Sequence, residues 1–166
     1  MKNSTLYVDM DGTLCVFDTM KTIEEIASPG YFRTVEPMKN MISAIKMVSK
    51  IRPVRILSVV INENAISDKR FWLSHYLGEE FAKNAIFISC GKKKSSMASK
   101  NDSVSFLLDD FSKNLHEWKS KRRVGIKVYN GINGTNGTWD GYSVHSDSTT
   151  DCIYKQLLGI MSEETK

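Results

Sequence analysis

The sequence contains five short apolar segments, which are separated by stretches with helical periodicity. Each segment is a nearly continuous apolar run rather than an alternation of apolar and polar residues, which is typical of strands covered on both faces. Neighbouring parallel strands need a crossover, and a helix usually supplies it. The pattern therefore predicts an α/β fold, a three-layer Rossmann-like parallel sheet with helices on both faces. The expected strands are 5–9, 54–60, 85–89, 104–109 and 124–130.

The segments between the strands carry the signals of helices. Residues 37–50 place their apolar side chains on one face. Residues 67–78 begin with Ser67, a residue type that caps helix N-termini, and end with Gly78, which is typical just beyond a helix C-terminus. Two more helices are expected at 111–121 and 149–161.

One stretch, directly after the first strand, breaks this alternation. A helical pattern at 16–27 is followed by a Pro-Gly turn and a short aromatic stretch before the helix at 37–50. A chain of 166 residues is long enough for one substantial core. We therefore expect a single domain, 1–166, with a small insertion at about 15–50 that lies over the ends of the strands.

Four aspartates occur at the ends of two predicted strands. Asp9 ends the first strand and Asp11 follows it, while Asp109 and Asp110 close the fourth. In an open parallel sheet the carboxyl ends of the strands face one crevice, where ligands bind. Like charges that meet there need a cation, and Mg²⁺ prefers oxygen ligands. Taken singly, each pair has a plainer interpretation, an Asp-Gly turn or acids at a helix N-terminus.

A hydroxyl and a lysine would face the same crevice. Ser58 lies near the end of the second strand, and Lys94 follows the third, with Lys92 and Lys93 competing for its place. Together with D-M-D-G-T at 9–13 and L-L-D-D at 107–110, these residues resemble the four motifs of the haloacid dehalogenase (HAD) superfamily. The stretches SDKRFWLSHYLG and LLDDFSKNLHEW are similar to its small 5'(3')-deoxyribonucleotidase branch.

This resemblance implies a HAD-like fold with a small helical cap inserted after the first strand. It implies a Mg²⁺-dependent phosphomonoester hydrolase in which Asp9 is the nucleophile, forming an aspartyl-phosphate, and Asp11 is the general acid and base. A carboxylate nucleophile divides one difficult hydrolysis into two easier steps. The metal ligands would be Asp9, Asp109, Asp110 and the backbone carbonyl of Asp11, and the phosphoryl group would be bound by Thr13, Ser58 and Lys94.

Three aromatic residues lie at the cap position, namely Phe17, Tyr31 and Phe32. They either stack on a nucleobase, as aromatic rings can, or form the core of the cap. Stacking would suit a 5'-nucleotidase that acts on (deoxy)nucleoside monophosphates, with a small phosphorylated substrate as its partner. The alternatives are a phosphatase for a sugar phosphate or another small phosphate, and a regulatory or binding module with little turnover. The presence of Asp11 argues against the last of these, since a module without turnover has no need of it.

Composition and charge narrow the possible partners. The net charge is +4, and the basic runs at 91–95 and 119–123 lack the interleaved aromatics of a nucleic-acid surface, so no nucleic acid polymer is expected. No apolar run approaches the length of a membrane span and no signal segment opens the sequence, so we expect no membrane association and a cytoplasmic location. The three cysteines are far apart and are expected to be reduced thiols.

Two features stay open at this stage. The Gly/Asn-rich stretch at 130–141 is either a flexible surface connection or a rim near the site. The oligomeric state has no signature in the sequence.

Overall fold

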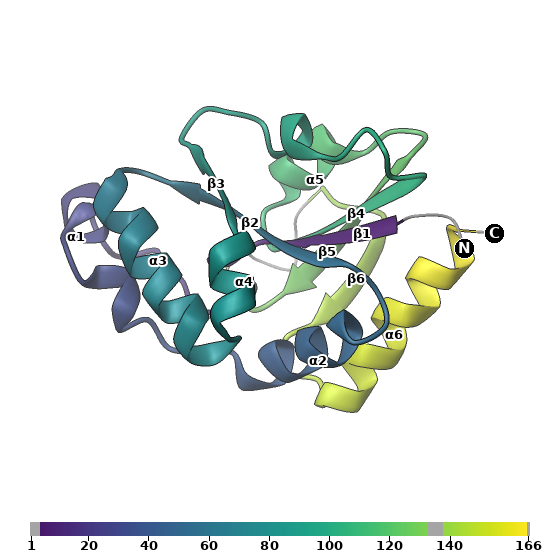
Figure 1. The fold of residues 1–166 in the computed structure, drawn as a ribbon, viewed down its shortest axis with the longest axis horizontal. Coiled ribbons are helices and arrows are strands. Elements are labelled where there is room, and N and C mark those ends of the chain that lie inside the picture. The colour runs from purple at the N-terminus through teal and green to yellow at the C-terminus, as the bar shows by residue number, and fades with distance from the viewer. Residues whose placement is uncertain (1–3, 133–137, 166) are drawn as a thin grey trace.

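A single six-stranded sheet forms the centre of the molecule (Figure 1). The structure is a computed structural model that describes residues 4–132 and 138–165. The strand order is β3-β2-β1-β4-β5-β6, and all neighbouring strands are parallel. This confirms the predicted α/β class and the Rossmann-like sheet. The strands are β1 (Ser4–Val8), β2 (Val54–Val60), β3 (Ile86–Ser89), β4 (Val104–Asp109), β5 (Arg123–Tyr129) and β6 (Tyr142–His145).

Helices cover both faces of the sheet and complete the three layers. Helices α2, α3, α4 and α6 pack on one face, and α5 and η2 lie on the other (Figure 1). None of the helices in the described ranges combines the length and the apolar character that crossing a bilayer requires. The helices are α1 (Ile23–Ala27), α2 (Lys39–Ser49), α3 (Glu63–Tyr76), α4 (Glu79–Asn84), α5 (Ser112–Trp118) and α6 (Thr150–Glu163), with two 3-10 helices, η1 (Tyr31–Arg33) and η2 (Lys94–Met97).

The central strands are apolar throughout because each of their faces is buried. In β1, Leu6 and Val8 face the larger core, whereas Tyr7 between them faces the smaller one. The smaller core also contains Trp118 of α5, whose indole Nε1 donates to the backbone oxygen of Ser105 at 3.2 Å. Successive side chains of a strand point to opposite faces, so a sheet with two covers needs apolar residues at every position.

Several elements differ from the prediction: α4 was not expected, and the helical pattern at 16–27 forms a helix only in α1 (Ile23–Ala27). Helix α3 begins at Glu63 rather than at residue 67, because the side chain of Asn62 accepts a hydrogen bond from the backbone nitrogen of Ala65 at 2.9 Å and caps it. Ser67 therefore lies inside the helix. Strand β6 was not predicted, because its four residues directly follow the Gly/Asn-rich stretch and include few apolar side chains. Residues 133–137 of that stretch lie outside the described part of the chain.

The chain between β1 and α2 leaves the sheet and returns to the same place. The backbone nitrogen of Val16 donates to the oxygen of Glu36 at 2.8 Å, and the nitrogen of Met38 donates to the oxygen of Leu14 at 2.8 Å. We call residues 16–38 the outer segment; it contains α1 and η1 and lies beside α3 (Figure 1). Helix α2 falls within the insertion expected at 15–50 but packs in the larger core, so the outer segment is shorter than that range.

Helix α3 holds the outer segment in place through polar contacts. The buried carboxylate of Asp68 accepts hydrogen bonds from the backbone nitrogen of Gly30 at 2.6 Å and from Nε of Arg33 at 2.7 Å. The indole Nε1 of Trp72 donates to the backbone oxygen of Val35 at 2.9 Å. Side chains of α3 therefore bind the outer segment to the body of the protein at three points.

Replacing Asp68 with alanine should loosen the outer segment and leave the sheet intact. The substitution leaves a partly buried backbone donor, the nitrogen of Gly30, without this acceptor, which costs about 1–3 kcal/mol. Limited proteolysis within residues 28–36 should then be about tenfold faster or more, while the far-ultraviolet circular dichroism keeps its shape. Asp151→Ala is the matched control, since it removes only an exposed ion pair with Lys155 and should leave the cleavage rate unchanged. Equal cleavage of D68A and the unchanged protein would contradict this role.

Candidate active site

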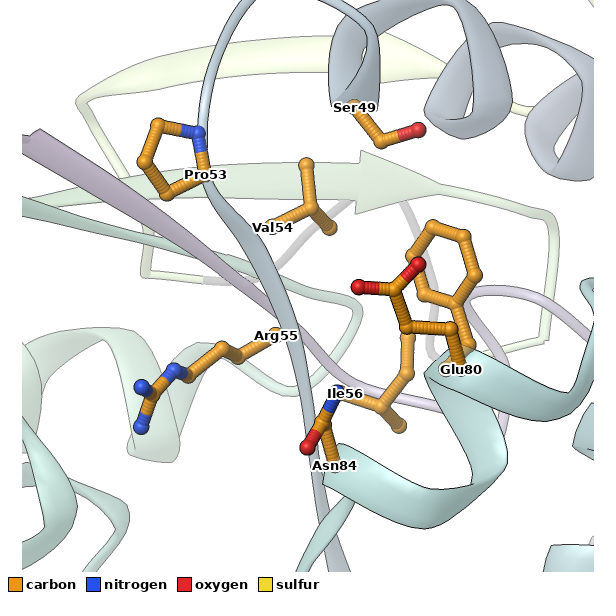
Figure 2. A pocket seen from close by; sticks show the side chains of 8 residues that line it. Ser49, Pro53, Val54, Arg55, Ile56, Glu80 and Asn84 are labelled. Carbon is orange, nitrogen blue, oxygen red and sulfur yellow. The ribbon is translucent and has the colours of Figure 1, made fainter.

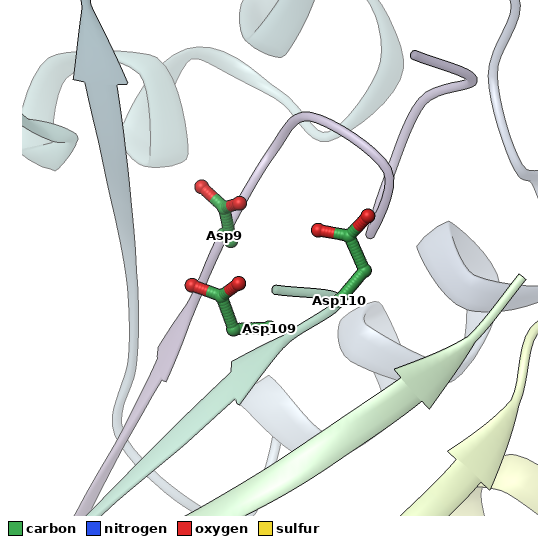
Figure 3. A group of neighbouring side chains, drawn as sticks. All are labelled: Asp9, Asp109 and Asp110. Carbon is green, nitrogen blue, oxygen red and sulfur yellow. The ribbon is translucent and has the colours of Figure 1, made fainter. Parts of the chain in front are cut away.

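Three carboxylates from two neighbouring strands meet at the carboxyl edge of the sheet. Asp9 follows β1, Asp109 ends β4 and Asp110 follows it, and Figure 3 shows their side chains around a common space. All three are buried, and one oxygen of each lies within 4.8 Å of the others. The parallel register pairs Val8 with Leu108. The residues that follow them, Asp9 and Asp109, therefore lie at the same level along the two neighbouring strands. The structure thus brings together the acids that the sequence placed at two strand ends.

Lys94 pairs with two of these carboxylates. Its Nζ lies 2.7 Å from Oδ1 of Asp9 and 2.7 Å from Oδ2 of Asp109. Burial alone would lower the pKa of Lys94, but attraction to Asp109 and Asp9 outweighs it, and the pKa is raised above its usual value. Lys92 and Lys93 are exposed. Of the three candidate lysines, Lys94 is the one that the structure places among the acids.

Asp109 is held rigidly. Its Oδ1 accepts a hydrogen bond from the backbone nitrogen of Phe111 at 2.8 Å, and its Oδ2 accepts from Lys94 at 2.7 Å and from Nδ2 of Asn114 at 3.0 Å. Burial raises the pKa of Asp109 to about 6; Lys94 opposes this shift and Asp9 adds to it. The ionised form of Asp109 therefore depends on nearby positive charge.

A second buried lysine, Lys69 of α3, holds Asp11. Its Nζ donates to Oδ2 of Asp11 at 2.5 Å, to Oγ of Ser58 at 2.9 Å and to the backbone oxygen of Val59 at 2.8 Å. Burial raises the pKa of Asp11, while the charge of Lys69 opposes the shift. Lys69 thus joins the end of β2 to the turn after β1, and connects two of the predicted site residues.

Sequence analysis missed Lys69, although a signal for it exists. Ala65, Trp72 and Leu73 are all buried, and they stand four residues before and three and four residues after Lys69. Residues at these spacings share one face of a helix. A lysine on the apolar face of a helix lies in the interior, where it needs an anionic partner. The stretch had been interpreted only as an amphipathic helix.

The turn after β1 depends on Gly12. Its φ of +70° is in the left-handed region, which favours glycine, and a Cβ at this position would lie 2.0 Å from Oδ2 of Asp110. Nδ2 of Asn130 donates to the backbone oxygen of Gly12 at 2.5 Å and to Oδ2 of Asp110 at 3.1 Å. The first residue of the Gly/Asn-rich stretch is therefore part of the site.

The hydroxyl of Thr13 lacks a partner. Its Oγ1 is buried and makes no hydrogen bond to the described part of the chain. A buried polar group without a partner costs about 1–3 kcal/mol. An oxygen atom of a bound ligand would satisfy this hydroxyl, so Thr13 supports a site for an oxygen-rich ligand close to the acids.

The aromatic residues of the outer segment differ in their placement. Phe32 is 3% exposed, packs with Val60 and lies with its ring centre 4.3 Å from Nζ of Lys69. It belongs to the interior, so of the two interpretations open from sequence its placement matches the core of the cap and not stacking on a nucleobase. Tyr31 is half-buried, and its pKa is raised by burial and further by the charge of Asp11. Phe17 is half-buried as well.

A separate hollow of about 230 Å³ lies near the other end of β2 (Figure 2). It is lined by residues that include Val54 of β2 and Glu80 and Asn84 of α4. It contains none of the predicted site residues, and the acid cluster remains the candidate active site.

The acid cluster fits a small divalent cation. Mg²⁺ binds oxygen ligands at about 2.0–2.1 Å in an octahedron, which separates the ligand oxygens by roughly 3–4 Å. The oxygens of Asp9, Asp109 and Asp110 need only small movements to reach this geometry. These three residues, with the backbone oxygen of Asp11 as a fourth candidate, would hold the ion.

Comparisons with known proteins bear on the fold. No family profile and no curated protein matches the sequence. Among solved structures, the chain is similar to a protein of Burkholderia xenovorans LB400 whose assignment as a haloacid dehalogenase-like hydrolase is itself provisional. The similarity covers 100% of both chains with a TM-score of 0.59 and 11% sequence identity. At this identity the likeness confirms a HAD-like fold and leaves the activity to be argued from the site.

Gly12→Ala should disrupt the acid cluster. The new methyl group would collide with the carboxylate of Asp110, so we expect Mg²⁺ affinity, measured by isothermal titration calorimetry, to fall about tenfold or more. Gly78→Ala is the matched control, because Gly78 also has a positive φ but has no atom within 4 Å of the added Cβ. Both variants should lose about 1–2 kcal/mol of stability to backbone strain. Unchanged Mg²⁺ binding by G12A would contradict the proposed geometry.

Mg²⁺ binding should weaken as the pH falls below about 6. The ion binds ionised carboxylates, and the pKa of Asp109 without metal is about 6, so protons compete with Mg²⁺ below that value. For one competing proton the dissociation constant rises about tenfold for each pH unit below the pKa. Calorimetric titrations at about pH 7.5, 6 and 5 would measure this, with circular dichroism to verify folding. A dissociation constant that does not change over this range would contradict the raised pKa.

Proposed function

We propose that the protein is a Mg²⁺-dependent phosphomonoester hydrolase of the haloacid dehalogenase type. The observation that carries the proposal is the buried group of Asp9, Asp109 and Asp110, with Lys94 bridging the first two. The group lies between β1 and β4, where the strand order of the sheet reverses, and open α/β sheets bind their ligands at such a point. The pattern of acids, hydroxyls and lysine at four strand ends supports the same reaction.

Asp9 is the proposed nucleophile. Lys94 holds its Oδ1 at 2.7 Å, which fixes the position of the carboxylate. In the first step Asp9 forms a bond to phosphorus, and the bond from phosphorus to the leaving oxygen breaks. In the second step water attacks the phosphorylated Asp9 and releases inorganic phosphate.

Asp11 is the proposed general acid and base. It donates a proton to the leaving oxygen in the first step and accepts one from the attacking water in the second. Burial raises its pKa, which suits proton donation, while Lys69 keeps the carboxyl group oriented through a 2.5 Å contact. Lys69 also donates to Oγ of Ser58, so the hydroxyl hydrogen of Ser58 is directed to another acceptor.

Phosphoryl transfer needs positioning and charge neutralisation more than covalent chemistry. The hydroxyls of Thr13 and Ser58 and the ammonium group of Lys94 would bind the phosphoryl oxygens, which also gives the unpaired Thr13 hydroxyl an acceptor. When bound by the carboxylates, Mg²⁺ supplies a Lewis acid that offsets the negative charge of the phosphoryl group.

The substrate we propose is a (deoxy)nucleoside monophosphate. Tyr31 is half-buried and its hydroxyl group is affected by the charge of Asp11, and Phe111, which directly follows Asp110, is 48% exposed. Aromatic side chains on two sides of the acids could stack on a nucleobase, and such stacking is worth about 1–3 kcal/mol for each base. The proposed stacking on the base uses Tyr31 and Phe111 and does not involve Phe32, which is buried.

The purified protein with Mg²⁺ should release phosphate from nucleoside monophosphates faster than from sugar phosphates. Chelation of the metal should abolish the release. A panel of phosphomonoesters assayed for inorganic phosphate would measure both effects. Equal rates on sugar phosphates and nucleotides would reject the nucleotidase and leave the phosphatase, whereas no release from any substrate would favour a binding module.

Asp9→Asn should lower kcat by at least about a thousandfold, because it removes the group that accepts the phosphoryl. Lys69→Met should lower kcat less, by about ten- to a hundredfold, since Asp11 remains but loses its orientation. Asp151→Asn on the surface is the control and should retain full activity. Turnover by D9N near the level of the unchanged protein would contradict the mechanism.

A further inference from the structure

A third buried lysine lies next to the acid cluster and has no part in the mechanism above. Lys127 of β5 is 1% exposed and pairs in register with Asp109 of β4. Its Nζ donates to the backbone oxygen of Asp110 and, at 3.0 Å, to Oγ of Ser112. The side chain therefore reaches across from the neighbouring strand to the turn that carries Asp110.

The buried charges of the described chain gather almost entirely at this site. Apart from Asp68, which pairs with Arg33 of the outer segment, every buried charged side chain belongs to the group. With the partly exposed Asp11, four carboxylates face three ammonium groups. The buried members are Asp9, Lys69, Lys94, Asp109, Asp110 and Lys127.

Two of the lysines form ion pairs with three of the four carboxylates. Lys94 pairs with Asp9 and Asp109, and Lys69 pairs with Asp11. Lys127 is the ammonium group bonded to the backbone of the fourth acid, Asp110, and both Asp110 and Asp109 attract its charge. Buried charges cost several kcal/mol each unless opposite charges accompany them. Without Lys127 the metal-free site would contain two more negative than positive charges.

We propose that Lys127 is a positioning residue that stands in for part of the metal's charge and so keeps the acid cluster formed before Mg²⁺ binds. This inference rests on the proposed function, in that Mg²⁺ is the ion concerned. Lys127 and Mg²⁺ then compensate for the same excess of negative charge, so the loss of Lys127 increases the contribution that Mg²⁺ binding makes to stability. Lys127 acts through Asp110 and need not touch the substrate.

A charge-compensating role of Lys127 can be distinguished from a role in packing by comparing melting temperatures with and without Mg²⁺. Lys127→Met keeps a similar length and removes the charge, so the excess of negative charge grows and Mg²⁺ compensates for it. The melting temperature of K127M should therefore fall more in chelator than in saturating Mg²⁺. A lysine needed only for packing or for its hydrogen bonds would lower both melting temperatures equally.

Thermal unfolding in chelator and in saturating Mg²⁺ tests this directly. We expect the Mg²⁺-induced rise in melting temperature to be larger in K127M than in the unchanged protein by about 3 °C or more. Lys127→Arg retains the charge and should show a rise close to that of the unchanged protein. Ser112→Ala is the matched control, because it removes one contact of Lys127 without changing any charge, and its rise should also be unchanged.

A double variant covers the case in which K127M alone does not fold. Lys127→Met combined with Asp110→Asn restores the charge balance, so it should recover stability in chelator relative to K127M. An equal or smaller Mg²⁺-induced rise in K127M, or no recovery in the double variant, would overturn the inference while the Mg²⁺ site stands. No rise in the unchanged protein would overturn both the inference and the proposed metal dependence.

Discussion

Four carboxylates cannot share a largely buried corner of a protein unless cations accompany them, and this requirement organises the carboxyl edge of the sheet. Three lysines reach the acids from three different elements: Lys94 from η2, Lys69 from α3 and Lys127 from β5. Each is almost completely buried. Under the proposed function, the residual negative charge would attract a divalent cation, and that cation would allow a phosphate dianion to approach carboxylates that otherwise repel it.

The sheet topology brings these residues together because adjacent parallel strands end at the same edge. Strands β1 and β4 are adjacent although almost one hundred residues separate them, and the strand order reverses between them. No helix fills the crevice at such a point, so side chains at the strand ends face a ligand instead of a neighbouring element. Gly12 then lets the chain turn against Asp110, and Asn130 joins the two loops. The site is built on strand ends and short turns, which position groups more rigidly than long loops.

Sequence revealed five of the six strands and the acids, but not most of the cations. Apolar runs mark buried strands because both faces are covered, and an aspartate after such a run is conspicuous. Lys127 carries no comparable mark, because the strand around it is otherwise apolar, and Lys69 shows only the weaker signal of a position on the apolar face of its helix. The role of Phe32 stays open from sequence, because sequence cannot distinguish an aromatic ring on the core side of a short segment from one on the open side. The α3 boundary was missed because the Asn62 cap precedes the apolar pattern.

The central claim is that Asp9 accepts a phosphoryl group beside a Mg²⁺ ion held by the acid cluster. A crystal structure of the protein with Mg²⁺ and beryllium fluoride, which mimics a phosphoryl group on a carboxylate, tests it most directly. The account predicts beryllium bonded to a carboxylate oxygen of Asp9, with Mg²⁺ coordinated by Asp9 and by at least one of Asp109 and Asp110. Beryllium fluoride on another residue, or a metal ion bound away from Asp9, would contradict it.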